Sequence, residues 1–305
     1  MADQTSRRTF LRVVGTALGG VAVGACAGDG KAGVRADSTA LTDSGDATAS
    51  RSPGRAVGIQ LYTLRSLMER NVENTLASVA DIGYREVEFA GYFGRDPKQL
   101  RATLDRLQLS APSTHIPLAD LRSTLPALLD TAETLGHRYI VCPYVDEGER
   151  TAAGYRKLAG EFNKWGAACR ERGIRFAYHN HDFEFKRAGD VAVPYDFLLA
   201  ETDPASVAME VDLYWITKGG KDPLAYFQKH RGRFPLWHVK DMGADAAKEI
   251  VPVGEGQIDF RRIFASADQA GLDHFFVEQD NAADNGADPI KNIRTSFQSV
   301  RGLVA

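Results

Sequence analysis

The sequence predicts a single (β/α)₈ TIM barrel, an α/β fold, over residues 56–305, preceded by a signal peptide and a flexible tether. Short apolar runs alternate with amphipathic segments at the roughly 25–40-residue repeat expected of this barrel. Polar residues follow almost every run, and helix-ending glycines precede several. The alternative, a doubly wound open sheet, would carry a glycine-rich loop after its first strand. Leu61 to Arg65 stand there instead.

Eight apolar runs are predicted as the strands of the barrel. Their ranges are Val57–Tyr62, Glu86–Ala90, Ser110–His115, Tyr139–Pro143, Arg175–Asn180, Val207–Asp212, Leu236–Val239 and Phe275–Glu278. Helical periodicity separates the runs and is clearest over Val72–Ile82, Leu118–Leu135 and Ala153–Arg172. Glycine commonly ends a helix, and Gly83, Gly136 and Gly173 each stand just before a strand.

The first 26 residues have the pattern of an export signal. The paired Arg7 and Arg8 precede a short apolar run, residues 13–25, as in a twin-arginine signal. That run is shorter than the about 20 residues of a membrane span. It ends at Cys26, in a context typical of lipoprotein processing, so we expect Cys26 to carry the lipid.

Residues 27–55 consist mainly of Ala, Gly, Ser, Thr and Asp. Such a segment cannot bury enough apolar surface to offset its ordering entropy, which predicts a disordered linker. We therefore expect a protein exported by the twin-arginine route and anchored by its lipid on the periplasmic side of the cell envelope.

Composition narrows the function further. The formal net charge of -3 provides no strong basic field, which argues against nucleic acid as a partner. The cysteines Cys26, Cys142 and Cys169 form no CxxC pair, so a zinc knuckle or disulfide framework is not predicted. We expect Cys142 and Cys169 to be buried thiols, although a disulfide between them is the alternative.

Ionisable and polar residues gather at the carboxyl ends of the predicted strands, which form one mouth of a barrel. They are Glu88, His115, Tyr144, His179, Asn180, His181, Glu210, Asp212, His238, Lys240, Asp241, Glu278 and Asp280. Unpaired buried charges are costly, so these groups must pair or hold a cation. Carboxylates with imidazoles suit Mn²⁺, Co²⁺, Fe²⁺ or Zn²⁺, whereas Mg²⁺ prefers more oxygen ligands. An ordinary hydrogen-bonding role is the alternative for any single residue.

Seven segments together resemble the xylose isomerase-like TIM-barrel family of sugar phosphate isomerases and epimerases. They are GIQLYTLR, GYREVEFAGYFG, YHNHDFEF, MEVDLYW, WHVKDM, VGEGQIDF and FVEQD, in order over residues 57–300. The family includes ketose 3-epimerases, hydroxypyruvate isomerases, inosose dehydratases and relatives that act on keto sugars and glycosides. The resemblance therefore implies an activity on sugars without fixing the substrate.

The resemblance also implies a divalent-metal site. The ketose epimerases hold their metal with Glu, Asp, His and Glu from strands five to eight. The last three correspond to Asp212, His238 and Glu278, while His179, or alternatively His181, stands in place of the strand-five glutamate. This departure puts a symmetric two-carboxylate epimerase mechanism in doubt. Trp215 likewise replaces a histidine that those epimerases carry.

The implied chemistry removes a proton from the carbon beside a carbonyl, while the metal stabilises the enediolate. We assign Glu278 as metal ligand and base, and His181 or Glu184 as the second acid/base. Lys240 contacts the substrate or an oxyanion, unless it is consumed by an ion pair with Asp241 or Glu210. Side chains expected to bind the substrate are Glu88, His115, Trp215, Tyr62 and Tyr144.

Several readings of the function stay open. Sugar phosphates are scarce outside the cytoplasm, so we expect a free sugar, keto sugar or glycoside. If a leaving group lies β to the carbonyl, the same enolate expels it, which makes dehydration or glycoside elimination an alternative. A sugar-binding lipoprotein without turnover is another. The resemblance implies dimers or tetramers, and a homodimer is the expectation here.

Overall fold

A computed structural model describes residues 55–303 of the chain. Within this range parallel strands close into a barrel in the order β1-β10-β7-β6-β5-β4-β3-β2, which confirms the predicted fold class. The strands are β1 Gly58–Gln60, β2 Glu86–Ala90, β3 Ser110–His115, β4 Tyr139–Cys142, β5 Arg175–His179, β6 Val207–Asp212, β7 Leu236–Val239 and β10 His274–Val277. The predicted signal peptide, Cys26 and all of the predicted linker except Arg55 lie outside the described residues.

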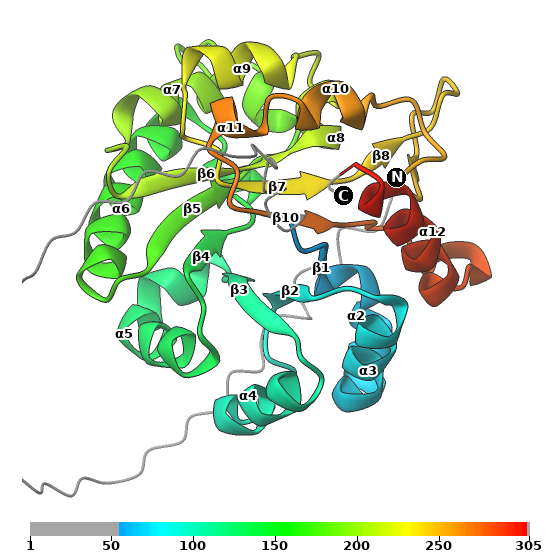
Figure 1. Cartoon of the computed structure of the whole chain (residues 1–305). Coiled ribbons are helices and arrows are strands. Elements are labelled where there is room, and N and C mark those ends of the chain that lie inside the picture. The colour runs from blue at the N-terminus through cyan, green and yellow to red at the C-terminus, as the bar shows by residue number, and fades with distance from the viewer. Residues whose placement is uncertain (1–54, 304–305) are drawn as a thin grey trace, which may run out of the picture.

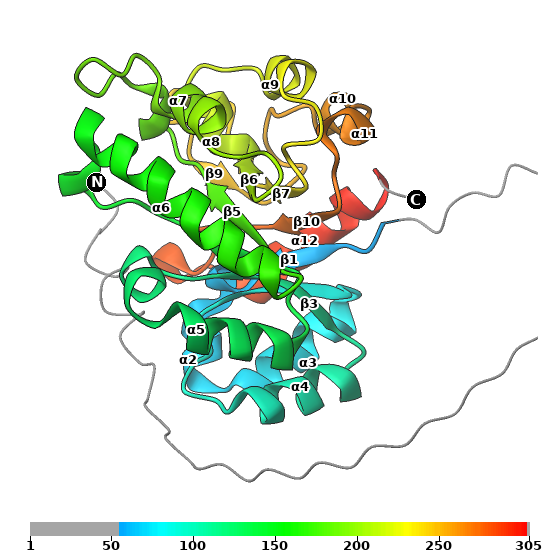
Figure 2. The same cartoon turned by 90° about the vertical axis from the view of Figure 1, so that its left-hand side faces the viewer.

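Helices surround the barrel, as Figures 1 and 2 show. They are α2 Arg65–Arg70, α3 Val72–Ile82, α4 Pro97–Arg106, α5 Leu118–Leu135, α6 Ala152–Glu171, α7 Pro194–Glu201, α8 Leu213–Lys218, α9 Pro223–Lys229, α10 Phe260–Phe264, α11 Ala267–Ala270 and α12 Pro289–Arg301. Single 3₁₀ turns are η1 Leu61–Leu64, η2 Glu147–Glu149, η3 Phe183–Phe185 and η4 Asp284–Gly286. No helix of residues 55–303 combines the length and apolarity that a membrane span requires.

The predicted helix patterns match the observed helices closely. In α3 the buried positions include Val72, Leu76, Val79 and Ile82, the stripe that the periodicity predicts. The side chain of Asn71 caps the first turn by accepting a hydrogen bond from the backbone of Asn74. Gly136 ends α5 in the left-handed conformation, where a glycine pays no Cβ penalty.

Strand ends differ from the sequence prediction by a few residues. The first strand stops at Gln60 rather than Tyr62, because the chain turns into η1. The Gln60 side chain caps this turn by accepting from the backbone N–H of Tyr62 at 2.9 Å. The last strand begins at His274 and ends before Glu278.

Apolar side chains on the inner face fill the lower half of the barrel. They are Tyr139, Val141, Ala177, Ala208, Leu236 and Phe276, and we call them the floor. A larger core, which includes Phe176 and Tyr178, belongs to the other face of the strands, under the helices. Because side chains alternate along a strand, a residue two positions after a floor residue also faces inward.

A short hairpin that the sequence did not predict follows β7. Its strands are β8 Asp241–Met242 and β9 Ile250–Val251. The Asp241 carboxylate accepts hydrogen bonds from the backbone N–H groups of Gly254, Gly256 and Ile258, at 2.9–3.2 Å. A Cβ on Gly256 would lie 2.3 Å from Asp241 Oδ1, so this close approach requires glycine. The Gly254–Gly256 turn thus fixes the seventh loop, and Asp241 is committed to it.

Candidate metal centre and active site

Ionisable side chains occupy the barrel interior above the floor. The inner face of β6 reads Ala208, Glu210 and Asp212, so a floor residue is followed by two carboxylates. On β7, Leu236 of the floor is followed by His238 and then Lys240. These residues form two layers, a lower layer directly above the floor and an upper layer above that.

The lower layer is a buried network around two glutamates; it comprises Gln60, Glu88, Ser113, His115, His179, Glu210 and His238. Glu88 accepts hydrogen bonds from Gln60 Nε2 at 2.7 Å and from Ser113 Oγ at 2.5 Å. Its Oε2 also lies 2.6 Å from His238 Nε2 and 3.2 Å from His115 Nε2. Glu88 is fully buried, and both of its oxygens are engaged.

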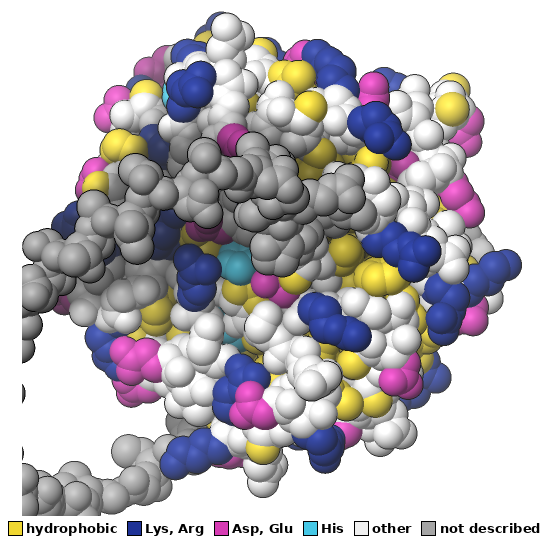
Figure 3. Space-filling view, viewed as in Figure 1, with side chains coloured by type: hydrophobic (Ala, Val, Ile, Leu, Met, Phe, Trp, Pro, Cys, Tyr) yellow, Lys and Arg dark blue, Asp and Glu magenta, His cyan; other side chains and the backbone are white. Residues whose placement is uncertain are grey.

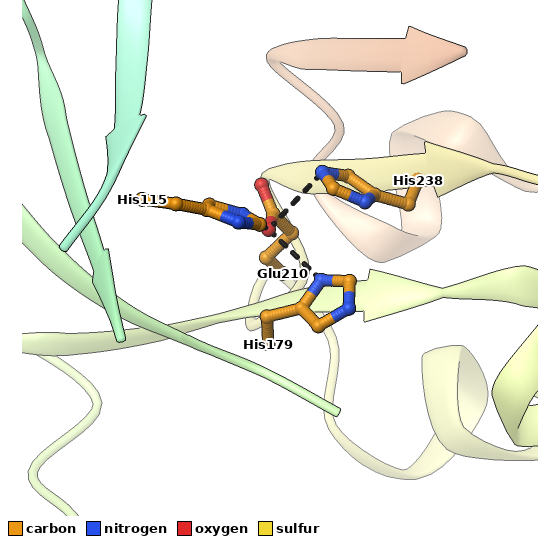
Figure 4. Close-up of side chains that lie close together, drawn as sticks. All are labelled: His115, His179, Glu210 and His238. Atoms are coloured by element: carbon orange, nitrogen blue, oxygen red, sulfur yellow. Dashed lines mark hydrogen bonds and ion pairs between the residues drawn. The ribbon is translucent and has the colours of Figure 1, made fainter. Parts of the chain in front are cut away.

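Glu210 lies at the centre of three imidazoles (Figure 4). Its Oε2 is 2.6 Å from His115 Nε2, 3.0 Å from His179 Nδ1 and 3.3 Å from His238 Nε2. Its other oxygen, Oε1, is buried and has no hydrogen-bond partner within residues 55–303. The rings come from three different strands, β3, β5 and β7, which the closed barrel brings together.

The upper layer places a lysine among three carboxylates. Lys240 Nζ lies 2.6 Å from Glu278 Oε2 and 3.0 Å from Asp212 Oδ2. It also lies 3.4 Å from both oxygens of Asp280. Asp212 Oδ1 accepts from the backbone N–H groups of Tyr214 and Trp215, which starts α8. Lys240 therefore does not pair with Asp241 or Glu210, the two alternative partners predicted for it, in the described structure.

Two histidines link the layers through opposite ring nitrogens. His179 presents Nδ1 to Glu210 and Nε2 to Asp212, whose Oδ2 is 3.7 Å away. His238 presents Nε2 to Glu88 and Nδ1 to Glu278, at 2.9 Å from Oε2. Each ring can therefore direct one nitrogen upward, while a carboxylate below holds its orientation.

Burial and neighbouring charges set the protonation of the layers. Burial, together with nearby positive charge, holds the pKa of His179 well below its usual value, so its ring is neutral. Burial would lower the pKa of His115, but the carboxylates of Glu88 and Glu210 outweigh it and raise that pKa to about 9. Burial would raise the pKa of Glu278, but Lys240 and His238 hold it well below its usual range. Glu278 is thus an ionised carboxylate in this setting.

The predicted metal ligands converge. One donor atom each of His179, Asp212, His238 and Glu278 lie within 4.8 Å of one another, and all four residues are buried. Asp212 Oδ2 makes no hydrogen bond within residues 55–303, although Lys240 is near it. Two imidazole nitrogens and two carboxylate oxygens suit Mn²⁺, Co²⁺, Fe²⁺ or Zn²⁺. The donor set fits such an ion, provided that the ammonium group of Lys240 withdraws toward Asp280.

Aromatic side chains line one side of the upper layer. The Trp215 ring lies 5.3 Å from the ring of His181 and 5.5 Å from Lys240 Nζ. Tyr144 contacts His181 edge-on, with ring centroids 5.2 Å apart. Tyr62 lies elsewhere, beneath the guanidinium group of Arg65, which donates to the carbonyl oxygen of Asp280. Trp215, Tyr144 and His181 are therefore grouped beside Lys240, and Tyr62 is linked to Asp280 through Arg65.

Other predicted site residues lie away from the mouth. Glu184 is fully buried and bonded to Tyr178 Oη and to the backbone N–H of His181, at 2.8 Å for the latter. Tyr178 belongs to the outer core, so Glu184 faces the helices, and the prediction that it acts as an acid/base is wrong for this placement. Cys142 also belongs to the outer core, which removes it from the mouth; Cys142 and Cys169 are both free and buried.

The predicted substrate contacts Glu88 and His115 belong to the lower layer. Glu88 is completely buried and His115 is 7% exposed, and each is bonded to other members of the network. A supporting role beneath the site fits these contacts better than contact with a substrate. Gln60 and Ser113 were not predicted as site residues, and Glu210 was predicted only as a strand-end residue, because the roles of all three depend on neighbours across the strands.

Comparison with known families identifies the fold group. Residues 76–302 match the family model described as xylose isomerase-like TIM barrel. The chain belongs to this family.

The curated relatives and solved structures of this family agree with that assignment. An inosose dehydratase of Lacticaseibacillus casei is 24% identical over 71% of this chain and 85% of the relative. An inosose dehydratase of Geobacillus kaustophilus is 27% identical over 69% of this chain and 81% of the relative. A sugar phosphate isomerase/epimerase structure from Parabacteroides distasonis superposes with a TM-score of 0.71, at 24% identity, over 85% of this chain and 99% of that one. This last likeness shows the fold alone.

Proposed function

We propose that this protein is a divalent-metal-dependent enzyme of sugar isomerase/epimerase type, which removes a proton from the carbon beside a carbonyl of a free, keto or glycosidic sugar. One observation carries the proposal: His179, Asp212, His238 and Glu278 converge beside Lys240 in a buried mouth. These four residues would hold the ion. When bound, the ion supplies Lewis-acid stabilisation of negative charge on a substrate oxygen. The IolI protein, which is similar in fold, has a crystal structure with bound zinc, which makes zinc one candidate.

The chain's own residues supply the proton transfer. Glu278 is ionised because Lys240 and His238 lower its pKa. It becomes a stronger base, able to accept a proton from carbon, when Lys240 withdraws toward Asp280. Burial would lower the pKa of Lys240, but Asp212, Asp280 and Glu278 hold that pKa above its usual value. Lys240 therefore remains an ammonium group that can donate a hydrogen bond to an oxygen as that oxygen becomes negative. Trp215 and Tyr144 offer flat apolar faces for a sugar ring.

A lyase reaction is the second candidate, and a specific asymmetry favours it. Epimerisation with two carboxylates needs a second base opposite Glu278, but β5 supplies His179, which is bonded to Glu210. Loss of a leaving group β to the carbonyl needs one base for carbon and a proton donor for the leaving group. His181, beside Trp215, is our candidate for that donor. Several curated relatives carry the name inosose dehydratase, which supports keeping this reaction in view.

Export remains part of the proposal. We propose that the twin-arginine motif directs export and that Cys26 carries a lipid that holds the barrel at the periplasmic side of the envelope. This location favours unphosphorylated substrates. Arg7→Lys with Arg8→Lys should leave the protein in the cytoplasm, and Cys26→Ser should move it from the membrane fraction to the soluble fraction. Unchanged fractionation of both variants would contradict this part.

Solvent deuterium exchange tests the enzymatic proposal. The purified full-length chain is incubated in D₂O with free sugars, inososes and 3-keto glycosides, first with Mn²⁺ and then with EDTA, and followed by NMR. We expect deuterium at a carbon beside a carbonyl, or an eliminated product, only when metal is present. Tight sugar binding with no exchange and no product, unaffected by Glu278→Gln, would instead identify a binding protein.

A further inference from the structure

We propose that the lower layer is itself a divalent-cation site, formed by His115, His179, Glu210 and His238. This position lies beneath the one used in the proposed function. The two positions share His179 and His238 but differ in their other donors. The proposal therefore gives the same ion a resting position below the one from which it would meet a substrate, and it does not depend on which sugar reaction takes place there.

The geometry of the donor atoms carries the proposal. Metal–ligand bonds of about 2.1 Å place neighbouring donor atoms about 3.0–3.4 Å apart. Around Glu210 Oε2 the three imidazole nitrogens lie at 2.6, 3.0 and 3.3 Å, and all four donor atoms lie within 4.8 Å of one another. Figure 4 shows the three rings directed at this oxygen from different sides. Small outward shifts of these side chains would make room for an ion.

An unpaired acceptor at the same place is the second observation. Glu210 is completely buried, and its Oε1 finds no hydrogen-bond donor within the described part of the chain. A buried carboxylate oxygen without a partner is costly. A bound cation would offset this cost, because it attracts both oxygens of the carboxylate. Three imidazoles and one carboxylate favour Zn²⁺, Co²⁺ or Mn²⁺ over Mg²⁺ or Ca²⁺.

The positive groups that an ion must displace differ between the two layers. In the upper layer, the Lys240 ammonium group already lies 2.6 Å from Glu278 and 3.0 Å from Asp212, so an ion there must displace it. In the lower layer, no lysine or arginine of residues 55–303 forms an ion pair with Glu88 or Glu210. An ion there must instead displace the protons through which His115 and His238 bond to Glu210 and Glu88. The carboxylate of Glu88 borders the lower position and adds a second negative charge. The lower position is therefore the one available while Lys240 stays between Asp212 and Glu278.

The two positions compete for the same rings. A neutral imidazole has one nitrogen lone pair, so it can ligate from one nitrogen only. The lower position uses His179 Nδ1 and His238 Nε2, whereas the upper position uses the opposite nitrogens. The protein should therefore bind one ion at a time, in the lower position while Lys240 stays paired and in the upper position once Lys240 withdraws.

Two neighbouring carboxylates provide matched variants. Glu210 and Asp212 lie two residues apart on β6, both completely buried, and only the former belongs to the lower position. Full-length protein freed of metal with EDTA is titrated with Co²⁺ by calorimetry and by visible absorption, as wild type, Glu210→Gln and Asp212→Asn. We expect one Co²⁺ per chain, at least about 100-fold weaker binding for Glu210→Gln and less than about threefold weakening for Asp212→Asn.

The outcomes separate this proposal from the proposed function. Weakening in Asp212→Asn as large as in Glu210→Gln, or an unaffected Glu210→Gln, overturns the lower site and leaves metal-dependent exchange possible at the upper one. Normal Co²⁺ binding in the lower site without exchange on any sugar sinks the proposed reaction instead. Wild-type protein that binds no Co²⁺ overturns both. If circular dichroism shows that Glu210→Gln is unfolded, His115→Gln replaces it, with the same expected loss.

Discussion

The two halves of the barrel interior lie on the same strands but differ in their side chains, since one half is apolar and the other carries the ionisable groups. In the floor, Ala177, Ala208, Leu236 and Phe276 pack against one another with no ionisable group among them. Two residues further along each strand, His179, Glu210, His238 and Glu278 replace them. The floor residues therefore form a rigid apolar frame, and the ionisable side chains stand at the carboxyl ends of the same strands.

Glu278→Gln should produce the largest effect, and it should fall on activity and on metal binding in the upper position rather than on the fold. The substitution keeps the size of the side chain but removes the ionised carboxylate that accepts the proton. We expect metal-dependent deuterium exchange to fall about 10²–10⁴-fold, measured by NMR on a responsive keto sugar. Circular dichroism should show an intact fold. Exchange within about threefold of wild type would remove Glu278 from the mechanism.

Phe276→Ala tests the opposite half of the comparison, two residues before Glu278. The ring is completely buried in the floor, so its removal leaves a cavity. We expect a loss of about 3–5 kcal/mol in the free energy of unfolding, measured by urea denaturation, with Phe276→Leu losing much less. If Phe276→Ala abolished exchange without loss of stability, the division between floor and mouth would be wrong.

Glu184 provides a pH test of a buried carboxyl group that lies outside the mouth. Burial raises its pKa from 4.5 to about 7. Between these two pH values the carboxyl group is protonated in the folded chain and ionised in the unfolded chain. The protonated group therefore contributes at most about 3 kcal/mol to the free energy of unfolding. This contribution is fully present below about pH 4.5 and is lost as the pH rises through about 7. Glu184→Gln should flatten that slope in urea denaturation, while Glu171→Gln on the exposed face of α6 should not. An unchanged slope in Glu184→Gln would show that Glu184 is ionised in the fold.

Trp215→Phe should give the smallest effect, since it keeps an aromatic face and loses only the indole N–H and some contact area. The Nε1 atom of Trp215 is buried and has no hydrogen-bond partner in residues 55–303. We expect KM for a responsive sugar to rise about three- to tenfold with kcat nearly unchanged, a loss of about 1 kcal/mol. A fall in kcat alone would argue that Trp215 acts through Lys240 rather than on the sugar.

The sequence predicted the fold well because its signals are local. The periodicity of Val72–Ile82 and the left-handed Gly136 fix helix faces and ends without knowledge of neighbours. The family resemblance, rather than any spacing along the chain, implied that His179, Asp212 and His238 meet, and their donor atoms lie within 4.8 Å of one another. What the sequence could not supply was the contact between strands. The ion pairs of Lys240 and the three rings around Glu210 depend on barrel closure and strand shear, which leave no trace in spacing along the chain. Glu184 was misplaced because it lies in η3, beyond the end of β5, where strand alternation no longer applies.

The central claim is that a divalent ion binds among the buried histidines at the top of the barrel. Anomalous diffraction from a crystal of the protein grown with Mn²⁺ or Co²⁺ tests this claim most directly. The account predicts a single strong peak within about 2.3 Å of a ring nitrogen of both His179 and His238, on the Glu210 side if the lower site holds the ion. A map with no peak near either ring, and with Lys240 still paired to Asp212 and Glu278, would contradict it.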